Sequence, residues 1–301
     1  MNIKSLFPVT FKERLHRKAT FFHFLLHDEE VSPLAYRELA LSKAYETLRR
    51  KYSFFLEEHS YVLSDTTTPK IIWWCWMQGE ENTPPICKAC LWSVRKHYPD
   101  YEVRVVTSEN MSDYIHLPKH VMAKYEKGII GNTHFSDILR SALLAEYGGV
   151  WIDSTVFVTG NHDNLFEEPL FVFQDWKYDL PHANVASNWL MVAHKSHPII
   201  CVMRDLLYEY WKDNDKDVNY LFYYLFFHMA TDKYSDLWQK VPRYLNTTPT
   251  LLQYEMYRPY SEKRFTQLCR MTDFHKLNWK HTGRDDLHGT YYEKILSTLN
   301  S

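Results

Sequence analysis

Glycine is scarce in this sequence, and neither sign of charge is in excess. The chain of 301 residues has 8 glycines, and its 35 Lys and Arg are balanced by 37 Asp and Glu. Without a surplus of positive charge, the chain lacks the electrostatic footprint of a nucleic-acid-binding protein. Hydrophobic residues at 45% and charged residues at 24% also exclude the composition of a disordered or low-complexity protein. We therefore expect a globular protein with a large core and no nucleic-acid partner.

Long hydrophobic runs are absent as well. A transmembrane helix needs about 18 or more consecutive apolar residues, and the candidate stretch YLFYYLFF at 220–227 is far shorter. The N-terminal residues MNIKSLFPVTFKERLHRK do not contain the apolar segment of a secretory signal. Their Lys, Arg and Phe side chains are compatible with peripheral contact to a membrane surface, although a solvated helix face explains the same pattern. We expect a cytoplasmic protein, with a place at the inner face of the membrane as the alternative.

Cysteine is also sparse, and its spacing does not define a metal site. Of the five cysteines, Cys87 and Cys90 form a C-x-x-C pair, but no second pair is present to complete a zinc site. They fall in a helical pattern, PPICKACLWSVRKHY, where we expect free thiols. Free thiols are typical of a reducing compartment, which agrees with a cytoplasmic protein.

What the chain does have is aromatic residues, 16% of the sequence, and two successive patterns of secondary structure. Residues 1–60 favour helices, and a polar stretch, SDTTTPK, separates them from the rest of the chain. We expect a helical accessory region over 1–68 and a second domain over 69–301. In the second domain short strands alternate with helices, which predicts an α/β fold whose mainly parallel sheet is flanked by helices. The expected strands are 71–76, 101–107 and 150–158, and the expected helices are 84–97, 109–116, 118–127, 133–147 and 196–232.

The segment with the most chemistry is FSDILRSALLAEYGGVWIDSTVFV, at 135–158. Asp137 and Arg140 lie three residues apart and share one face of the expected helix. Two glycines then end the helix, and a buried strand leads to Asp153, at the edge of the sheet where α/β folds bind their ligands. Asp153 and Thr155 offer oxygen ligands to a divalent cation, and arginine suits phosphate groups.

Each feature of this segment also has a purely structural explanation. The Asp137–Arg140 pair could be a surface ion pair that contributes no more than about 0.5 kcal/mol. Asp153 could cap a turn, and the two glycines could simply end a helix. It is their combination, in this order and spacing, that indicates a ligand site.

The run S-D-I-L-R followed by Y-G-G-V-W-I-D-S-T resembles the S-D-x-x-R … Y-G-G-x-x-x-D-x-D core of glycosyltransferases with a DXD sugar-binding motif. It is more similar still to the capsular polysaccharide synthesis family, in which the last position of the motif is often not Asp. The resemblance begins at PKIIW, 69–73, and extends to about Trp279. It implies a GT-A fold, which is Rossmann-like, and transfer of a sugar from a nucleotide-diphosphate-sugar to a glycan or lipid-linked glycan acceptor. It also implies Mn²⁺ or Mg²⁺ as cofactor and retention at the anomeric carbon.

The resemblance implies roles for individual residues on the donor side. Trp76 matches the early tryptophan that stacks on the nucleobase, with Trp73 and Trp74 as alternative equivalents. Asp137 and Arg140 match the pair that contacts the ribose and sugar hydroxyls of the donor.

The cation site is where the sequence departs from the motif. Asp153 matches the first Asp, which bridges the cation and the ribose, and with Asp137 and Arg140 it forms the expected catalytic group. Thr155 stands where the second Asp normally binds the metal. A neutral hydroxyl is a weaker ligand for a hard cation than a carboxylate. Either the metal affinity is lower, or another residue compensates, or no metal is needed.

A compensating residue is expected near the C-terminus. His275 lies four residues before Trp279, the spacing at which a residue of the wider superfamily reaches the metal and the diphosphate. The resemblance therefore implies Asp153 and His275 as metal ligands and Trp279 as a donor contact, whereas a surface histidine is the structural alternative. Lys276 or Lys280 could instead neutralise the departing diphosphate.

Two further candidates lie on the sugar side. Asn188, followed by Trp189, resembles the S-N-x-x-x-x-A segment that lines the sugar pocket in the family. Asp217 lies where related sequences often carry D-Y, but it also belongs to a charge run at 212–217 that suits a solvated face.

Two other functional classes are compatible with these residues. A non-catalytic carbohydrate-binding protein on a degenerate GT-A fold would bind glycans without transferring sugar. A metal-dependent phosphohydrolase would use the same crevice, but it needs a second carboxylate cluster to hold two metals, which the sequence does not show.

Overall fold

The computed structural model describes residues 33–64, 67–161, 163–174, 186–280 and 287–300. The chain divides into two compact units, Met1–Ser42 and Lys43–Ser301. Of the first unit only the beginning of helix α2 (Pro33–Glu58) is described, and this helix agrees with the helical pattern of that part of the sequence. The N-terminal segment considered for membrane contact lies outside the described residues. The accessory region 1–68 stays a prediction.

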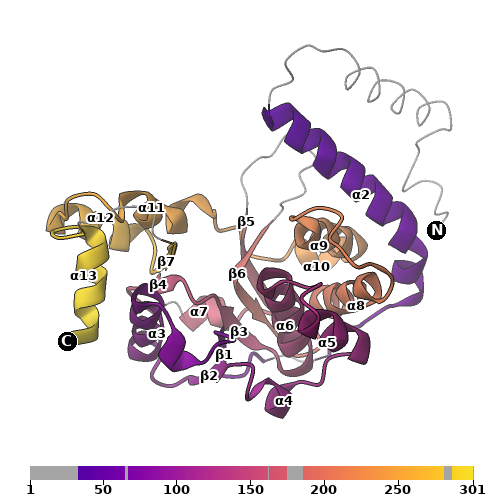
Figure 1. The fold of residues 1–301 in the computed structure, drawn as a ribbon, viewed down its shortest axis with the longest axis horizontal. Coiled ribbons are helices and arrows are strands. Elements are labelled where there is room, and N and C mark those ends of the chain that lie inside the picture. The colour runs from indigo at the N-terminus through magenta and orange to yellow at the C-terminus, as the bar shows by residue number, and fades with distance from the viewer. Residues whose placement is uncertain (1–32, 65–66, 162, 175–185, 281–286, 301) are drawn as a thin grey trace. The chain divides into compact units, whose positions relative to one another are not determined.

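The centre of the second unit is a five-stranded sheet (Figure 1). β1 is parallel to both β2 and β3, whereas β6 is antiparallel to β3 and to β5. Four of the five strands thus run in the same direction, which confirms the expected α/β fold with a mainly parallel sheet. In spatial order the strands are β2 (Glu102–Val106), β1 (Ile71–Cys75), β3 (Gly149–Ile152), β6 (Ala186–Ala193) and β5 (Leu170–Gln174).

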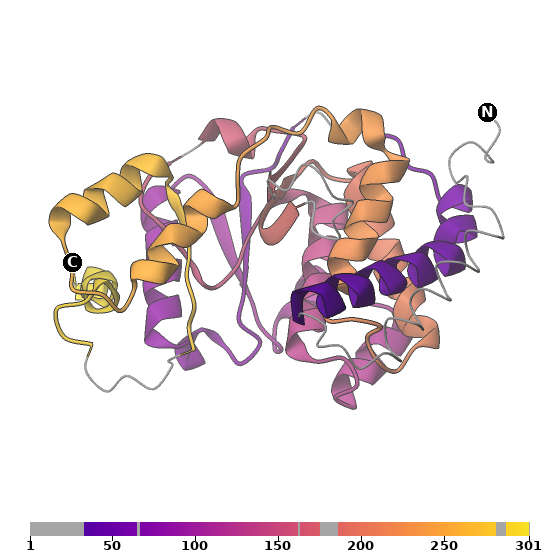
Figure 2. The same ribbon diagram turned by 90° about the horizontal axis from the view of Figure 1, so that it is seen from above.

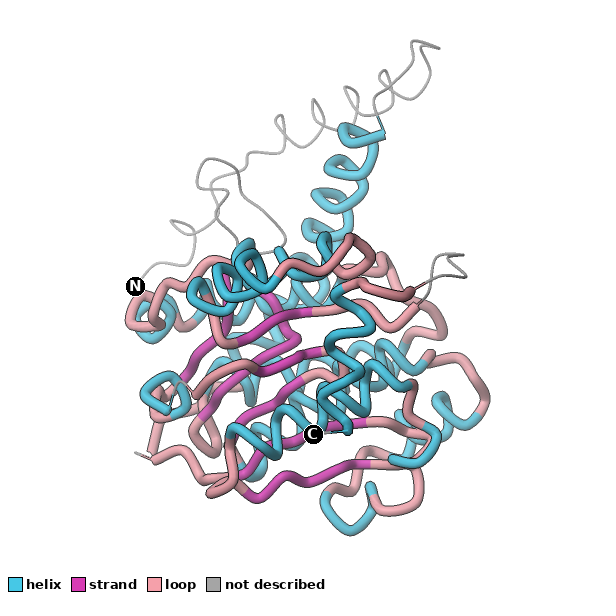
Figure 3. The backbone as a smooth tube through the Cα atoms, turned by 90° about the vertical axis from the view of Figure 1, so that its left-hand side faces the viewer, coloured by secondary structure: helices cyan, strands magenta, loops and turns pink. Residues whose placement is uncertain are grey.

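Helices cover both sides of this sheet. α6 (Asn132–Tyr147) packs on α8 (Pro198–Asp213) and α8 on α9 (Phe222–Lys233), whereas α3 (Pro85–His97) packs on strand β4 (Val156–Val158) and on α13 (Tyr291–Ser297). Figure 2 shows these two groups on opposite sides of the strands, and Figure 3 shows the strands side by side between helices. No helix of the described residues is long and apolar enough to cross a membrane. The other α-helices of the described residues after α2 are α4 (Met111–Tyr114), α5 (Lys119–Glu126), α7 (Asp163–Phe166), α10 (Ser235–Trp238), α11 (Thr247–Glu255) and α12 (Glu262–Met271).

Two expected elements are each divided in the structure. The helix expected over 196–232 is two helices, α8 and α9, because the polar stretch at 213–219 has few apolar side chains to bury. The strand expected over 150–158 is broken at Asp153 into β3 and β4 (Val156–Val158).

The break after β3 is a tight turn with a consequence for the site. The N–H of Val156 donates to the carbonyl of Asp153 (3.0 Å), which reverses the chain direction locally. β4 then pairs antiparallel with β7 (Phe274–Lys276) in a small second sheet. The turn thereby brings the C-terminal part of the chain to the end of β3.

Two of the scarce glycines lead from α6 into β3. Gly148 and Gly149 have φ angles of 73° and 97°, in the left-handed region that favours glycine. A Cβ atom on Gly149 would lie 2.6 Å from the carbonyl oxygen of Ile71 on β1. The glycines therefore allow α6 to pass directly into a central strand, which sets Arg140 on α6 beside Asp153 after β3.

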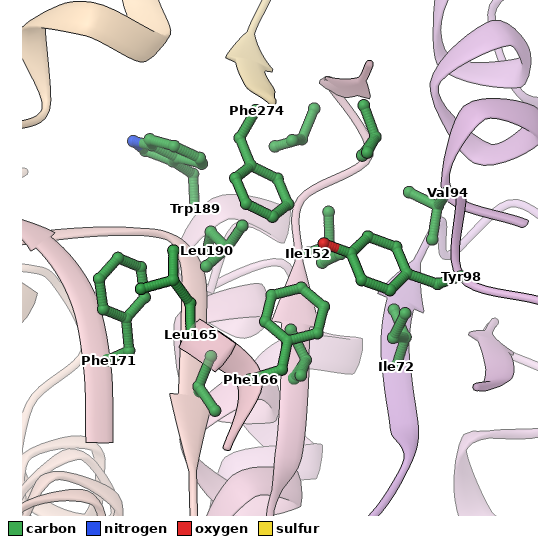
Figure 4. Close-up of a cluster of buried hydrophobic side chains, with 14 of the residues drawn as sticks. Ile72, Val94, Tyr98, Ile152, Leu165, Phe166, Phe171, Trp189, Leu190 and Phe274 are labelled. Carbon is green, nitrogen blue, oxygen red and sulfur yellow. The ribbon is translucent and has the colours of Figure 1, made fainter. Parts of the chain in front are cut away.

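The core next to this turn combines aliphatic and aromatic side chains (Figure 4). Trp189 belongs to it: the ring is buried, stacks on Phe173 with centroids 4.7 Å apart, and donates through Nε1 to Asn246 (2.9 Å). Trp189 is therefore a core residue. Cys87 and Cys90 are also buried, as free thiols on α3, which confirms the expectation for them.

Candidate functional site

Asp153 follows β3 directly, at the carboxyl end of the strand. Its backbone N–H donates to the carbonyl of Trp189 on β6 (2.8 Å), which holds the turn against the sheet. Arg140 Nη1 (3.0 Å) and Trp151 Nε1 (2.9 Å) both donate to Oδ1 of its carboxylate. Lys276 Nζ donates to Oδ2 (2.9 Å). Each oxygen of this carboxylate therefore already has a cationic partner.

These partners favour the ionised form of Asp153. Burial by itself raises the pKa of the carboxyl group, but the charges of Lys276 and Arg140 outweigh it. Hydrogen bonds from Lys276 and Trp151 act in the same direction, so the pKa of Asp153 lies below its usual range. Asp153 is a carboxylate at neutral pH.

Arg140 lies on α6 and links two carboxylates. Its Nη2 is 3.3 Å from Asp137 Oδ1, while its Nη1 contacts Asp153. The guanidinium also donates to the backbone carbonyl of Asn188 and to the hydroxyl of Ser136. The side chains of Arg140 and Asp137 are only 5% and 7% exposed, which excludes the explanation of this pair as a surface ion pair.

Asn188 on β6 joins the same network. Its Nδ2 donates to Asp137 Oδ1 (2.8 Å), and its Oδ1 accepts from the hydroxyl of Tyr224 on α9 (2.9 Å). On the other side of Asp137, His134 Nδ1 lies 3.7 Å from Oδ2. His134 Nε2 lies 3.6 Å from the carboxylate of Asp217. The network therefore extends from α6 to α9 and to the polar stretch after α8.

Lys276 occupies the position between Asp153 and Thr155. Its Nζ is 2.9 Å from Asp153 Oδ2 and 2.5 Å from Thr155 Oγ1. The register of β4 and β7 fixes this placement, since Val156 pairs with Lys276 and the N–H of Leu277 donates to the carbonyl of Thr155 (2.8 Å). The side chains of Lys276 and Asp153 are 23% and 21% exposed, so a ligand can reach them.

His275 faces away from this cluster. Neighbouring residues of a strand project to opposite faces of a sheet, so His275 and Lys276 cannot both face Asp153. His275 is buried, its Nε2 lies 3.0 Å from the hydroxyl of Thr159, and its Nδ1 has no hydrogen-bond partner among the described residues. Burial lowers the pKa of His275 to about 4, so the ring is neutral at physiological pH. The structure thus brings Lys276 to Asp153, where the resemblance implied His275, and it makes His275 a core residue, not a surface one.

The tryptophans near the end of β1 divide into two kinds. Trp73 and Trp74 are fully buried, so neither can stack on a nucleobase. Trp76 lies just beyond the strand and contacts the exposed Trp279 edge to face, with ring centroids 5.8 Å apart. Because β1 is parallel to β3, the end of β1 reaches the same edge of the sheet as Asp153.

The donor atoms at this edge do not fit a divalent metal. Within the described ranges, no group of three or more His, Cys, Asp or Glu could hold one. The candidate ligands are a single carboxylate, Asp153, and the hydroxyl of Thr155, and both accept hydrogen bonds from the ammonium of Lys276. Mn²⁺ and Mg²⁺ prefer several oxygen ligands, including carboxylates. A metal would have to displace Lys276 to bind here.

Some members of the network have no signal in the sequence that singles them out. Trp151 lies two residues before Asp153, inside the recognised motif, and the period of a strand could have placed its indole on the same side. Tyr224 belongs to an aromatic helix that composition assigns to the core, and His134 is one of 16 histidines. Their roles depend on contacts between α6, β6 and α9, which no local pattern shows.

Comparison with known proteins identifies the family. Residues 32–295 match the sequence model of the capsular polysaccharide synthesis protein family, so the chain belongs to this family. This confirms the resemblance that the motif indicated.

Individual relatives are more distant. In an alignment of 161 residues, this chain is 25% identical to the O-glycosyltransferase braB of Annulohypoxylon truncatum, and the match covers 48% of this chain but only 38% of that protein. Solved structures with partial likeness include PaToxG glycosyltransferase, at 15% identity and a TM-score of 0.43 over 86% of this chain and 96% of that one. Another is the galactosyltransferase LgtC in complex with donor and acceptor sugar analogues, at 12% identity and a TM-score of 0.41 over 76% of this chain and 95% of that one. These structural likenesses are too low to assign a function.

Proposed function

We propose that the protein is a glycosyltransferase that transfers a sugar from a nucleotide-diphosphate-sugar to a glycan or lipid-linked glycan acceptor in capsular or cell-surface polysaccharide synthesis. Membership of the capsular polysaccharide synthesis family supports this reaction class. The observation that carries the proposal is the line of alternating charges Asp137, Arg140, Asp153 and Lys276 at the carboxyl edge of the sheet. Retention at the anomeric carbon rests on the family resemblance.

Each part of a nucleotide sugar has a partner of suitable chemistry at this edge. Carboxylates accept hydrogen bonds from ribose and sugar hydroxyls, and Asp153 and Asp137 supply them. The partly exposed ammonium of Lys276 suits the diphosphate. The edge-to-face pair of Trp76 and Trp279 offers aromatic surface to a base.

Catalysis at such a site depends on position and charge. The breaking bond leaves negative charge on the diphosphate, and a fixed cation next to it lowers the free energy of that state. Arg140 does not need to touch the donor for this, because it holds Asp153 and Asp137 in place. The acceptor is then aligned next to Asn188 and Tyr224, which contact each other beside Asp137.

The first test is donor binding and transfer by the wild type and by Asp153→Asn. We expect UDP-, GDP- or CDP-sugars to raise the melting temperature of the wild type, since a ligand at 100 times its Kd adds about 2.7 kcal/mol to the free energy of unfolding. Asp153→Asn should abolish release of nucleoside diphosphate while the variant still unfolds cooperatively. The matched control is Asp236→Asn, on the exposed surface of α10, which should keep full activity.

Each alternative outcome has a distinct meaning. Full activity of Asp153→Asn would contradict the assignment of the site. Glycan binding without any response to donors would favour the carbohydrate-binding protein, and cleavage of simple phosphoesters would favour the phosphohydrolase.

A further inference from the structure

We propose that the ammonium of Lys276 takes the place of the divalent cation, so that the protein binds the donor diphosphate and stabilises its departure without a metal ion. This inference rests on the proposed function, because it concerns how the same site handles the diphosphate. It starts from a disagreement: the motif implies a metal between residues 153 and 155, and the structure puts a lysine there.

The geometry of Lys276 is that of a bridging cation. Its Nζ lies within hydrogen-bond distance of both Asp153 Oδ2 (2.9 Å) and Thr155 Oγ1 (2.5 Å), the two side chains that would hold the metal. Strand β7 carries the lysine, and the pairing of β7 with β4 fixes the position of Lys276 relative to the turn at Asp153. The lysine is therefore part of a built arrangement, not a surface side chain that happens to reach the carboxylate.

The net charge is the same at the metal site that the motif implies and at the lysine site of this protein. A divalent cation between two carboxylates leaves no net charge. An ammonium between one carboxylate and one hydroxyl likewise leaves none. Thr155 in place of an Asp removes one negative charge, and Lys276 in place of a metal removes one positive charge. The two departures from the motif therefore compensate each other.

Competition for Asp153 further disfavours a metal. Its Oδ1 already accepts from Arg140 and Trp151, and its Oδ2 accepts from Lys276. A hard divalent ion would have to replace an ammonium while gaining only one carboxylate and one hydroxyl as ligands from these protein side chains.

Lys276 can still bind a phosphate oxygen. An ammonium has three N–H groups, and two of them donate to Asp153 and Thr155. The third has no acceptor among the residues that the structure describes. Since the side chain is 23% exposed, this N–H is available to an incoming diphosphate.

The chemical step is balanced without a metal. The bond between the anomeric carbon and the phosphate oxygen breaks, and its electron pair stays on the diphosphate. The acceptor hydroxyl oxygen forms the new bond to the anomeric carbon, and its proton passes to the departing phosphate oxygen and from there to solvent. Lys276 keeps its proton throughout and stabilises the charge on the diphosphate.

The first experiment titrates Mn²⁺ alone into the metal-stripped protein, by calorimetry and by electron paramagnetic resonance. We expect the wild type not to bind Mn²⁺ at the site. We expect Thr155→Asp combined with Lys276→Met to bind it, because this double variant restores two carboxylates and removes the competing ammonium. Tight Mn²⁺ binding by the wild type that Asp153→Asn abolishes would overturn the proposal. The wild-type titration does not depend on the folding of any variant.

The second experiment measures binding of UDP, GDP and CDP in EDTA and in Mn²⁺. We expect one of them to bind the wild type with the same Kd, within about twofold, under both conditions. Lys276→Met should weaken this binding about 10- to 100-fold, as expected for loss of a charge-assisted hydrogen bond. The matched control Lys263→Met, at an exposed position on α12, should leave the Kd unchanged.

The outcomes separate this inference from the proposed function. Binding that is lost in EDTA and restored by Mn²⁺ would overturn the role of Lys276 and leave the glycosyltransferase proposal intact. Unchanged binding by Lys276→Met would do the same. No binding of any nucleoside diphosphate or nucleotide sugar, with or without Mn²⁺, would overturn both.

Discussion

Replacing Arg140 by methionine would remove the guanidinium between two carboxylates while keeping much of the apolar volume of the side chain. The side chains of Arg140 and Asp137 are 5% and 7% exposed, so Asp137 would lose its arginine partner inside the protein and keep the amide of Asn188 and the ring of His134, 3.7 Å away. Removal of one partner from a buried ion pair costs about 3–5 kcal/mol. Because Asp153 keeps its contacts to Lys276 and Trp151, we expect the lower end of this range, about 3 kcal/mol.

The assay is equilibrium unfolding in urea, with the loss read as a lower midpoint at unchanged slope. Arg95→Met is the matched control, because Arg95 also forms a two-pronged contact with a carboxylate, Glu80, at 2.7 and 2.9 Å. These side chains are 46% and 41% exposed, so their contact is screened by solvent and its loss should cost less than about 1 kcal/mol. Equal losses for the two variants, both below about 1 kcal/mol, would refute the view that the buried charges of this network depend on Arg140.

Two further predictions concern the turn that carries Asp153. The folded-state pKa of Asp153 lies below the unfolded value of about 3.9. The ionised carboxylate therefore stabilises the folded state above about pH 4, and this stabilisation is lost as the pH falls through the lower, folded-state pKa. The difference in unfolding free energy between the wild type and Asp153→Asn should therefore shrink on acidification, and a difference that stays constant from pH 7 to pH 3 would contradict this. Gly149→Ala should lower the free energy of unfolding by about 1–3 kcal/mol because of the backbone conformation at this position. The loss should be larger still, since the added Cβ would lie 2.6 Å from the carbonyl oxygen of Ile71. The assay is thermal unfolding, and the control is Gly128→Ala, since Gly128 has a φ of 70° but open space around its Cβ position. An equal loss of stability in both variants would show that the close approach of residue 149 to Ile71 is unimportant.

Much of the fold follows from local pattern. The apolar run at 71–76, the alternation at 101–107 and the helical spacing at 133–147 predict β1, β2 and α6 to within one or two residues. The division of 150–158 does not follow in this way, because the side chains at 150–152 and at 156–158 are all apolar and buried, as in a single strand. The turn is fixed by the pairing of β4 with β7, a strand far along the chain. Propensity within a short window cannot show such a partner.

The motif alone does not show whether His275 or Lys276 faces Asp153, whereas the cost of burying a charge does. Spacing from Trp279 identifies the segment, but a shift of one residue in the pairing of a strand exchanges the two faces. In the observed register His275 is buried as a neutral ring, which its pKa of about 4 allows, and Lys276 meets a carboxylate. The shifted register would bury an ammonium beside Thr159 and leave Asp153 with one cation fewer, at a cost of several kcal/mol. The residue that can be buried without its charge therefore turns inward, and its neighbour, which cannot, faces Asp153.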